Sequence, residues 1–115
     1  MERRNIIAEK SFQFAISIVE IYKTLKNESK EFILSKQLLR SGTSIGANVE
    51  EAIGGYSKKD FKFKMGIAYK EARETMYWLK LLQETNFILE EDATKLTNDC
   101  NEILKILWKI IKSSE

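Results

Sequence analysis

The residues with the clearest chemical potential form a short basic run at 58–64, in which lysines alternate with Asp60 and two phenylalanines. Lysines near the start of a helix attract phosphate, because the unpaired amides of the first turn add positive potential. The nucleic-acid-binding candidates are Lys58, Lys59, Lys62 and Lys64 from this run, together with Arg40 from an earlier segment. A lysine run is equally typical of a solvated helix face, and Phe61 and Phe63 resemble packing residues more than a base-stacking platform.

Pairs of carboxylates are the second group that could do chemistry. Glu50 and Glu51, or Glu71 and Glu74, could in principle hold a metal inside a helical bundle, but di-iron bundles use Glu-x-x-His pairs and this chain has no His. Ion pairs are therefore the preferred interpretation, and no metal site is expected. The predicted structural polar network consists of Asn48, Glu51, Lys70, Arg73 and Glu74, with Asn48 making a hydrogen bond between helices.

Composition excludes most catalytic chemistry. Without His there is no His-activated nucleophile, and the single Cys lies on an apolar helical stripe, where we expect it to behave as a small buried hydrophobic residue. The glycines at 40–46 and 54–55 match neither a Walker A loop nor a dinucleotide fingerprint, since both motifs need a preceding strand. We expect a protein that is not an enzyme and uses no cofactor.

Four amphipathic stretches must position these residues, and no segment alternates as a half-buried strand does. The chain has no proline, so helices can run long. The apolar spacing predicts helices over about residues 6–26, 31–53, 58–85 and 90–112, with Ser57 as the N-cap of the third. One continuous second helix is preferred to two short ones, although its Gly, Ser and Thr residues weaken it. Gly42 and Gly46, four residues apart, would let a neighbouring backbone approach closely.

Short connections between helices of this length predict one domain over residues 1–115, an antiparallel up-and-down four-helix bundle. In the hairpin of the second and third helices, residues whose numbers sum to about 112 should lie side by side. This register places Arg40 near Arg73 and Glu74, and Glu51 near Phe61 and Lys62.

The apolar surface exceeds what one such bundle buries. The first and fourth predicted helices carry apolar arcs of roughly 200°, about twice the usual stripe. Self-association is the preferred interpretation, and the alternative is a thick core with a few singly exposed residues. The candidate interface residues are Phe63, Ile67, Trp78, Leu81 and Trp108.

Charge and hydropathy indicate a soluble cytoplasmic protein. The chain has 19 Lys and Arg against 17 Asp and Glu, a net charge of +2, which is ordinary for a soluble domain. No apolar run approaches the ~18 residues that span a membrane. The apolar stretch after the N-terminal Arg3 and Arg4 is too short for a signal peptide.

One segment carries a family resemblance. Residues 37–52 contain a Ser-Ile-x-x-Asn-Val-x-Glu core at 44–51, followed by Lys-Asp-Phe at 59–61 and by the stretch 67–79. The pattern, strongest over about residues 34–82, resembles the four-helix-bundle protein family encoded in intervening sequences of bacterial 23S ribosomal RNA genes, which is also labelled a ribosomal protein family. Many members have Ala-Glu-Gly where this chain has Glu50, Glu51 and Ala52.

The resemblance implies a left-handed bundle that assembles as a ring-like homopentamer. It also implies kinship with the accessory protein of diversity-generating retroelements, whose basic pentamer binds nucleic acid and its reverse transcriptase. This chain is nearly neutral by comparison, so the resemblance alone does not transfer nucleic-acid binding. It supplies no catalytic residue.

Together these observations predict a non-enzymatic homo-oligomer with a nucleic-acid-binding accessory role. Its expected partners are further copies of itself, RNA or DNA, and a partner protein, with no membrane. The alternative is a structural or protein-interaction scaffold with no nucleic-acid role.

Overall fold

Four long helices account for nearly all of residues 5–114, the part of the chain that the computed structural model describes. They are α1 (Ile6–Asn27), α2 (Leu34–Ile53), α3 (Lys58–Glu84) and α4 (Glu90–Ser113). No strand occurs between residues 5 and 114. The predicted all-α class and the four helices are confirmed, and α2 is one continuous helix.

The largest boundary difference is at the start of α2, which begins three residues later than predicted. The Glu31 carboxylate accepts hydrogen bonds from the backbone N–H groups of Ile33, Leu34 and Ser35 at 3.2, 3.1 and 2.7 Å. These are amides that the first turn of a helix leaves without a partner. Glu31 therefore caps the helix from outside.

Side chains also cap two other helices. At α3 the Ser57 hydroxyl accepts from the backbone N–H of Asp60 at 3.0 Å, which confirms the predicted N-cap. At α1 the side-chain oxygen of Asn5 accepts from the backbone N–H of Ala8 at 3.0 Å. Such caps satisfy first-turn amides and fix where the helix begins.

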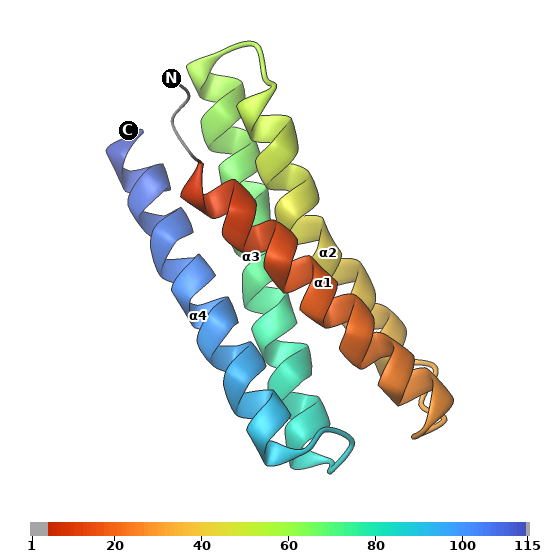
Figure 1. The fold of residues 1–115 in the computed structure, drawn as a ribbon. Coiled ribbons are helices and arrows are strands. Elements are labelled where there is room, and N and C mark those ends of the chain that lie inside the picture. The colour runs from red at the N-terminus through yellow and green to blue at the C-terminus, as the bar shows by residue number, and fades with distance from the viewer. Residues whose placement is uncertain (1–4, 115) are drawn as a thin grey trace.

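Successive helices run in opposite directions and pack side by side (Figure 1). Each helix packs against its two neighbours around the bundle, with α1 closing on α4, and the backbones of the diagonal pairs among these four helices do not approach closely. The seam between α1 and α4 is the most loosely packed of the four. The start of α1, the turn between α2 and α3, and the end of α4 lie at the same end of the bundle (Figure 1).

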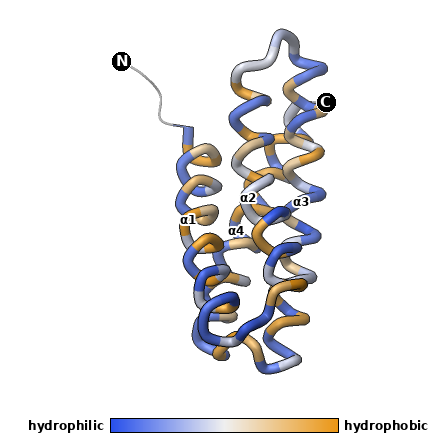
Figure 2. The backbone as a smooth tube through the Cα atoms, turned by 90° about the vertical axis from the view of Figure 1, so that its right-hand side faces the viewer, coloured by the Kyte–Doolittle hydropathy of each residue, from blue (hydrophilic) through white to orange (hydrophobic). Residues whose placement is uncertain are grey.

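The core draws on all four helices. Hydrophobic and hydrophilic segments alternate along each helix, as amphipathic helices require (Figure 2). The largest side chains that are completely or almost completely buried include Ile18, Leu25, Leu38, Ile45, Met65, Leu79, Leu82, Ile103 and Leu107.

Two glycines let α1 and α2 approach closely, as predicted. A Cβ atom added at Gly42 would lie only 2.8 Å from Cγ1 of the buried Ile18, and one at Gly46 would lie 3.3 Å from the carbonyl oxygen of Ser11. Real Cβ atoms essentially never come as close as the first of these. Because Gly42 and Gly46 have no side chains, α1 can pack closely against α2 at these two positions.

Candidate nucleic-acid interface

Helix α3 opens with the predicted lysine cluster. Lys58 and Lys59 are exposed in its first turn and Lys62 is half-buried one turn later. Within residues 5–114, neither Lys58 nor Lys59 forms an ion pair. Asp60 is the acidic residue of this first turn. The start of α3 therefore presents lysine charges to solvent beside a positive helix end.

Lys64 does not share this surface as a free cation. Its ammonium group donates a hydrogen bond to Glu51 of α2 at 2.8 Å, and the two side chains are 28% and 58% exposed. The hydrogen bond from Lys64 to Glu51 raises the pKa of the lysine, and the charges of Glu51 and Asp60 act in the same direction. The predicted register placed Glu51 near Lys62, whereas in the structure Glu51 pairs with Lys64, two residues further along α3.

Arg40 lies in a different environment, against the middle of α3. Its guanidinium nitrogen Nη2 lies 2.7 Å from Glu74 Oε2 and 3.2 Å from Glu71 Oε1, and Nη1 donates to Glu71 Oε2 at 3.3 Å. Glu71 Oε1 is buried and accepts no hydrogen bond, so its interaction with Arg40 is purely electrostatic. The pair of carboxylates more than neutralises the arginine.

Trp78 completes this cluster by donating from Nε1 to Glu74 Oε2 at 3.0 Å. The hydrogen bond from Trp78, then that from Arg40, lowers the pKa of Glu74, and the same carboxylates raise the pKa of Arg40. Glu71 follows Lys59 by twelve residues, or about 18 Å along a helix. The structure therefore does not bring Arg40 together with the lysine cluster.

The remaining members of the predicted polar network behave differently. Asn48 donates to the Ser44 carbonyl oxygen at 2.8 Å within α2, which corrects the expected bond between helices. Lys70 and Arg73 are exposed, and no ion pair joins either of them to the described part of the chain. Glu74 and Glu51 instead pair with Arg40 and Lys64.

A polar contact that does cross between α2 and α3 in the core was missed at the sequence level. The hydroxyl oxygens of Ser41 and Thr75 are hydrogen-bonded at 2.9 Å, and both residues are completely buried. A signal was present, because both residues occupy apolar stripe positions, Ser41 between Leu38 and Ile45 and Thr75 three residues after Ala72.

The predicted interface residues divide into two groups. Phe63, Ile67, Trp78 and Leu81 follow the outer side of α3; Phe63 is 64% exposed, and the other three are half-buried. Trp108 lies on α4 and is 51% exposed, with its ring 5.7 Å from that of Tyr69. Tyr69 and Trp78 are nine residues apart and so point to opposite sides of α3.

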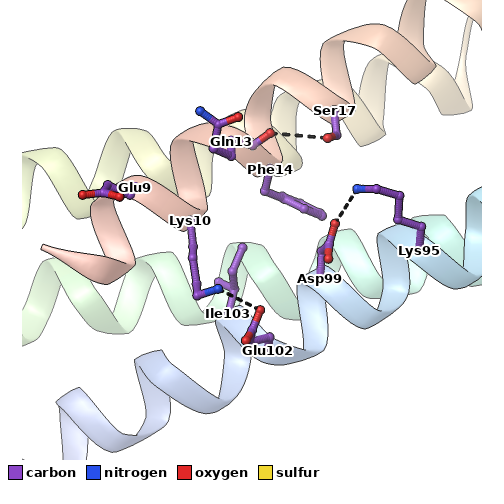
Figure 3. A pocket seen from close by; sticks show the side chains of 9 residues that line it. All are labelled: Glu9, Lys10, Gln13, Phe14, Ser17, Lys95, Asp99, Glu102 and Ile103. Atoms are coloured by element: carbon purple, nitrogen blue, oxygen red, sulfur yellow. Dashed lines mark hydrogen bonds and ion pairs between the residues drawn. The ribbon is translucent and has the colours of Figure 1, made fainter.

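A polar groove follows the loose seam between α1 and α4 (Figure 3). Phe14 and Ile103 are buried at its base. Lys10 pairs with Glu102 across the groove at 3.1 Å, and Lys95 pairs with Asp99 along α4 at 2.9 Å (Figure 3). No group of three or more potential metal ligands occurs in the described residues. Because Lys10 and Lys95 are paired with carboxylates, this groove is a poor site for phosphate.

The fold and surface define an all-α four-helix protein with an exposed lysine cluster at one helix end. The chain belongs to the 23S rRNA-intervening sequence protein family, whose model matches residues 3–109. It is similar to a crystal structure of a protein of unknown function from the S23 ribosomal protein family of Bacteroides thetaiotaomicron VPI-5482. The two are 54% identical with a TM-score of 0.91, over 92% of this chain and 98% of the other. No curated protein matches the chain significantly.

Among the described residues, no helix is long and apolar enough to cross a bilayer.

Proposed function

We propose that this protein is a non-enzymatic homo-oligomer that binds RNA or DNA through the lysine cluster formed by Lys58, Lys59 and Lys62. The observation that carries the proposal is the exposure of Lys58 and Lys59, without ion pairs among residues 5–114, at the N-terminal end of a 27-residue helix. Lysine charge and free helix amides both favour phosphate. Membership of a family named for intervening sequences in 23S rRNA supports RNA as the first ligand to test.

Apolar side chains on the outside of the bundle support the proposed self-association. Phe12 and Phe63 are each 64% exposed and Tyr77 is 60% exposed, on two different helices. Packing copies together would remove this surface from water. By family resemblance we propose a left-handed bundle assembled as a pentameric ring. Repeating the lysine cluster around a ring would strengthen binding to one nucleic-acid chain through multivalency.

The proposal includes no catalysis and no cofactor. The only thiol, Cys100, is completely buried, and burial raises its pKa to about 12, so it is a poor nucleophile. A single reduced thiol also supports a cytoplasmic location.

The second candidate function is a protein-interaction scaffold without a nucleic-acid role. The neutralisation of Arg40 and Lys64 by carboxylates favours it, as does the net charge of only +2. In that case the exposed apolar side chains on α1 and α3 would contact a partner protein.

A filter-binding titration with ribosomal RNA fragments separates these functions. We expect the wild-type protein to bind at low salt and the double variant Lys58→Glu/Lys59→Glu to bind at least about tenfold more weakly. A matched double charge reversal, Lys23→Glu/Lys36→Glu, changes exposed lysines on α1 and α2 and should bind as the wild type does. Equal binding by all three proteins, or none at low salt, would support the scaffold.

Light scattering during size-exclusion chromatography tests the oligomer. We expect a mass that is a multiple of 13.4 kDa, and five times that mass for a pentamer. A monomer at micromolar concentration would contradict self-association.

A further inference from the structure

A second surface with nucleic-acid chemistry lies between α3 and α4, where the middle of α3 meets the second half of α4. The half-exposed indole ring of Trp108 lies beside the ring of Tyr69, with centroids 5.7 Å apart and planes inclined by 44°. The two rings and Leu104 contribute to a shallow hollow. We call this surface the Trp108 hollow.

The rim of the Trp108 hollow is basic. It includes Arg73 from α3 and Lys105 and Lys109 from α4, and no Asp or Glu lines it. None of these three cations has an ion-pair partner within residues 5–114. Elsewhere on the bundle, Lys10, Arg40, Lys64 and Lys95 are all paired with carboxylates. The rim of the Trp108 hollow therefore carries three cations without ion pairs in the described part of the chain.

The side chain of Lys112 makes a cation–π contact with Trp108. The ammonium group of Lys112 lies 5.3 Å from the centre of the Trp108 ring, within the range of a cation–π interaction. The face of the half-exposed Trp108 ring therefore lies beside a positive charge. Aromatic faces bordered by cations suit a base that stacks while its phosphates contact Lys and Arg.

We propose that the Trp108 hollow binds single-stranded nucleic acid, with a base stacked on Trp108 and phosphates held by Arg73, Lys105 and Lys109. This inference rests on the proposed nucleic-acid function and names a surface for it. Double-stranded nucleic acid fits less well, because its bases are already stacked on one another and unavailable to an aromatic side chain.

The helical spacing connects this surface with the lysine cluster. Lys58, Lys62, Tyr69 and Arg73 are separated by four, seven and four residues, which places all four along one side of α3. From Lys58 to Arg73 this edge is about 22 Å long. A single strand following it would meet lysines first and the aromatic pair next.

The charge of the rim also argues against a two-fold contact in which the hollows of two copies face each other. Two such hollows facing each other would bring at least three cations from each copy together without an acidic partner in the hollow itself. A polyanion meets no such repulsion. Trp108 lies on α4, whereas the other predicted interface residues follow the outer side of α3.

The test uses a labelled single-stranded RNA of about 12 nucleotides and the matching duplex, followed by fluorescence anisotropy and by tryptophan emission. We expect Trp108→Ala to weaken single-strand binding about fivefold or more. We expect Arg73→Glu/Lys105→Glu to weaken it at least about tenfold. The controls are Phe32→Ala, an exposed aromatic residue near the start of α2, and Lys23→Glu/Lys36→Glu, and both should bind within about twofold of the wild type. RNA should quench tryptophan emission in the wild type but not in Trp108→Phe, which retains Trp78.

Three outcomes would overturn the inference. If Lys58→Glu/Lys59→Glu abolishes binding while Trp108→Ala and Arg73→Glu/Lys105→Glu bind normally, the proposed function stands and the Trp108 hollow is not the site. If Trp108→Ala lowers the oligomer mass and leaves RNA binding per subunit unchanged, Trp108 belongs to an interface between copies. If wild-type protein binds no RNA at low salt, both this inference and the proposed nucleic-acid function fail.

Discussion

The hydroxyl groups of Ser41 and Thr75 meet at 2.9 Å in the completely buried contact between α2 and α3. Thr75 also hydrogen-bonds to the carbonyl oxygen of Glu71 at 2.7 Å within its own helix. Arg40 precedes Ser41, and Glu74 precedes Thr75, so this register also brings the ion pair of Arg40 and Glu74 together at the surface. One buried polar pair and one surface ion pair therefore specify the same alignment of two helices.

Removing one hydroxyl of the buried pair should destabilise the protein. We expect Thr75→Val to lower the free energy of unfolding by about 1–3 kcal/mol, because it leaves Ser41 buried without this partner. The double variant Ser41→Ala/Thr75→Val should lose less than the sum of the two single variants. Urea unfolding at a fixed protein concentration measures all four proteins, and strict additivity would show that the two hydroxyls are not coupled.

The two glycines at 42 and 66 should respond oppositely to alanine. Gly42→Ala should destabilise the protein by about 1–3 kcal/mol, since its Cβ would overlap the buried, β-branched Ile18. Gly66, inside α3, has no heavy atom within 4 Å of an added Cβ. Gly66→Ala should therefore stabilise by about 0.5–1 kcal/mol through helix propensity. Thermal unfolding of the pair is the measurement, and a stabilising Gly42→Ala would contradict the close approach of α1 and α2.

Glu74 should titrate at lower pH than an ordinary glutamate, whose pKa is 4.5. Because the folded-state pKa is lowered, the charged carboxylate stabilises the fold above pH 4.5, and this contribution disappears as pH falls through the folded-state value. Trp78→Phe removes the donor at Glu74 Oε2 and should raise the pKa of Glu74 toward the ordinary value. NMR titration of the side-chain carboxyl carbon detects this change. An unaltered pKa in both Trp78→Phe and Arg40→Gln would show that neither donor acts on Glu74.

Cys100 should be inert in the folded protein. Burial raises the pKa of its thiol to about 12, and Sγ donates to the Ala72 carbonyl oxygen at 3.3 Å. At pH 8 we expect a thiol-specific disulfide reagent to react at least ~100-fold more slowly with folded protein than with protein unfolded in urea. Equal rates would mean that the seam between α3 and α4 opens readily.

Helix existence could be predicted from sequence because each helix repeats its apolar residues at spacings of three and four, and no proline interrupts them. The start of α2 could not, because Glu31 is a good helix former whose carboxylate caps the helix from outside. Nothing in its residue type distinguishes these two roles. Likewise the predicted alignment of α2 with α3 was correct for Arg40 and Glu74 but placed Glu51 two residues from its partner Lys64.

Which side chains stay exposed and which pair with another helix could not be predicted, because sequence spacing within one helix does not reveal the residues that face it from its neighbours. The lysines at 58–64 are adjacent in sequence, yet Lys64 turns toward Glu51 on α2 while Lys58 and Lys59 stay exposed. Asn48 looked like a core polar residue but bonds within its own helix, and Ser41 took the role between helices instead. The proximity of Tyr69 to Trp108 required the pairing of α3 with α4.

The salt dependence of RNA affinity tests the central claim most directly. Plotting the logarithm of the binding constant against the logarithm of salt concentration should give a negative slope for the wild type. That slope should become shallower by about 0.7–0.9 for each phosphate that a variant no longer neutralises, or by roughly 1.5 for Lys58→Glu/Lys59→Glu if each lysine binds one phosphate. A wild-type protein that fails to bind at low salt, or a double variant whose slope and affinity equal those of the wild type, would contradict the account.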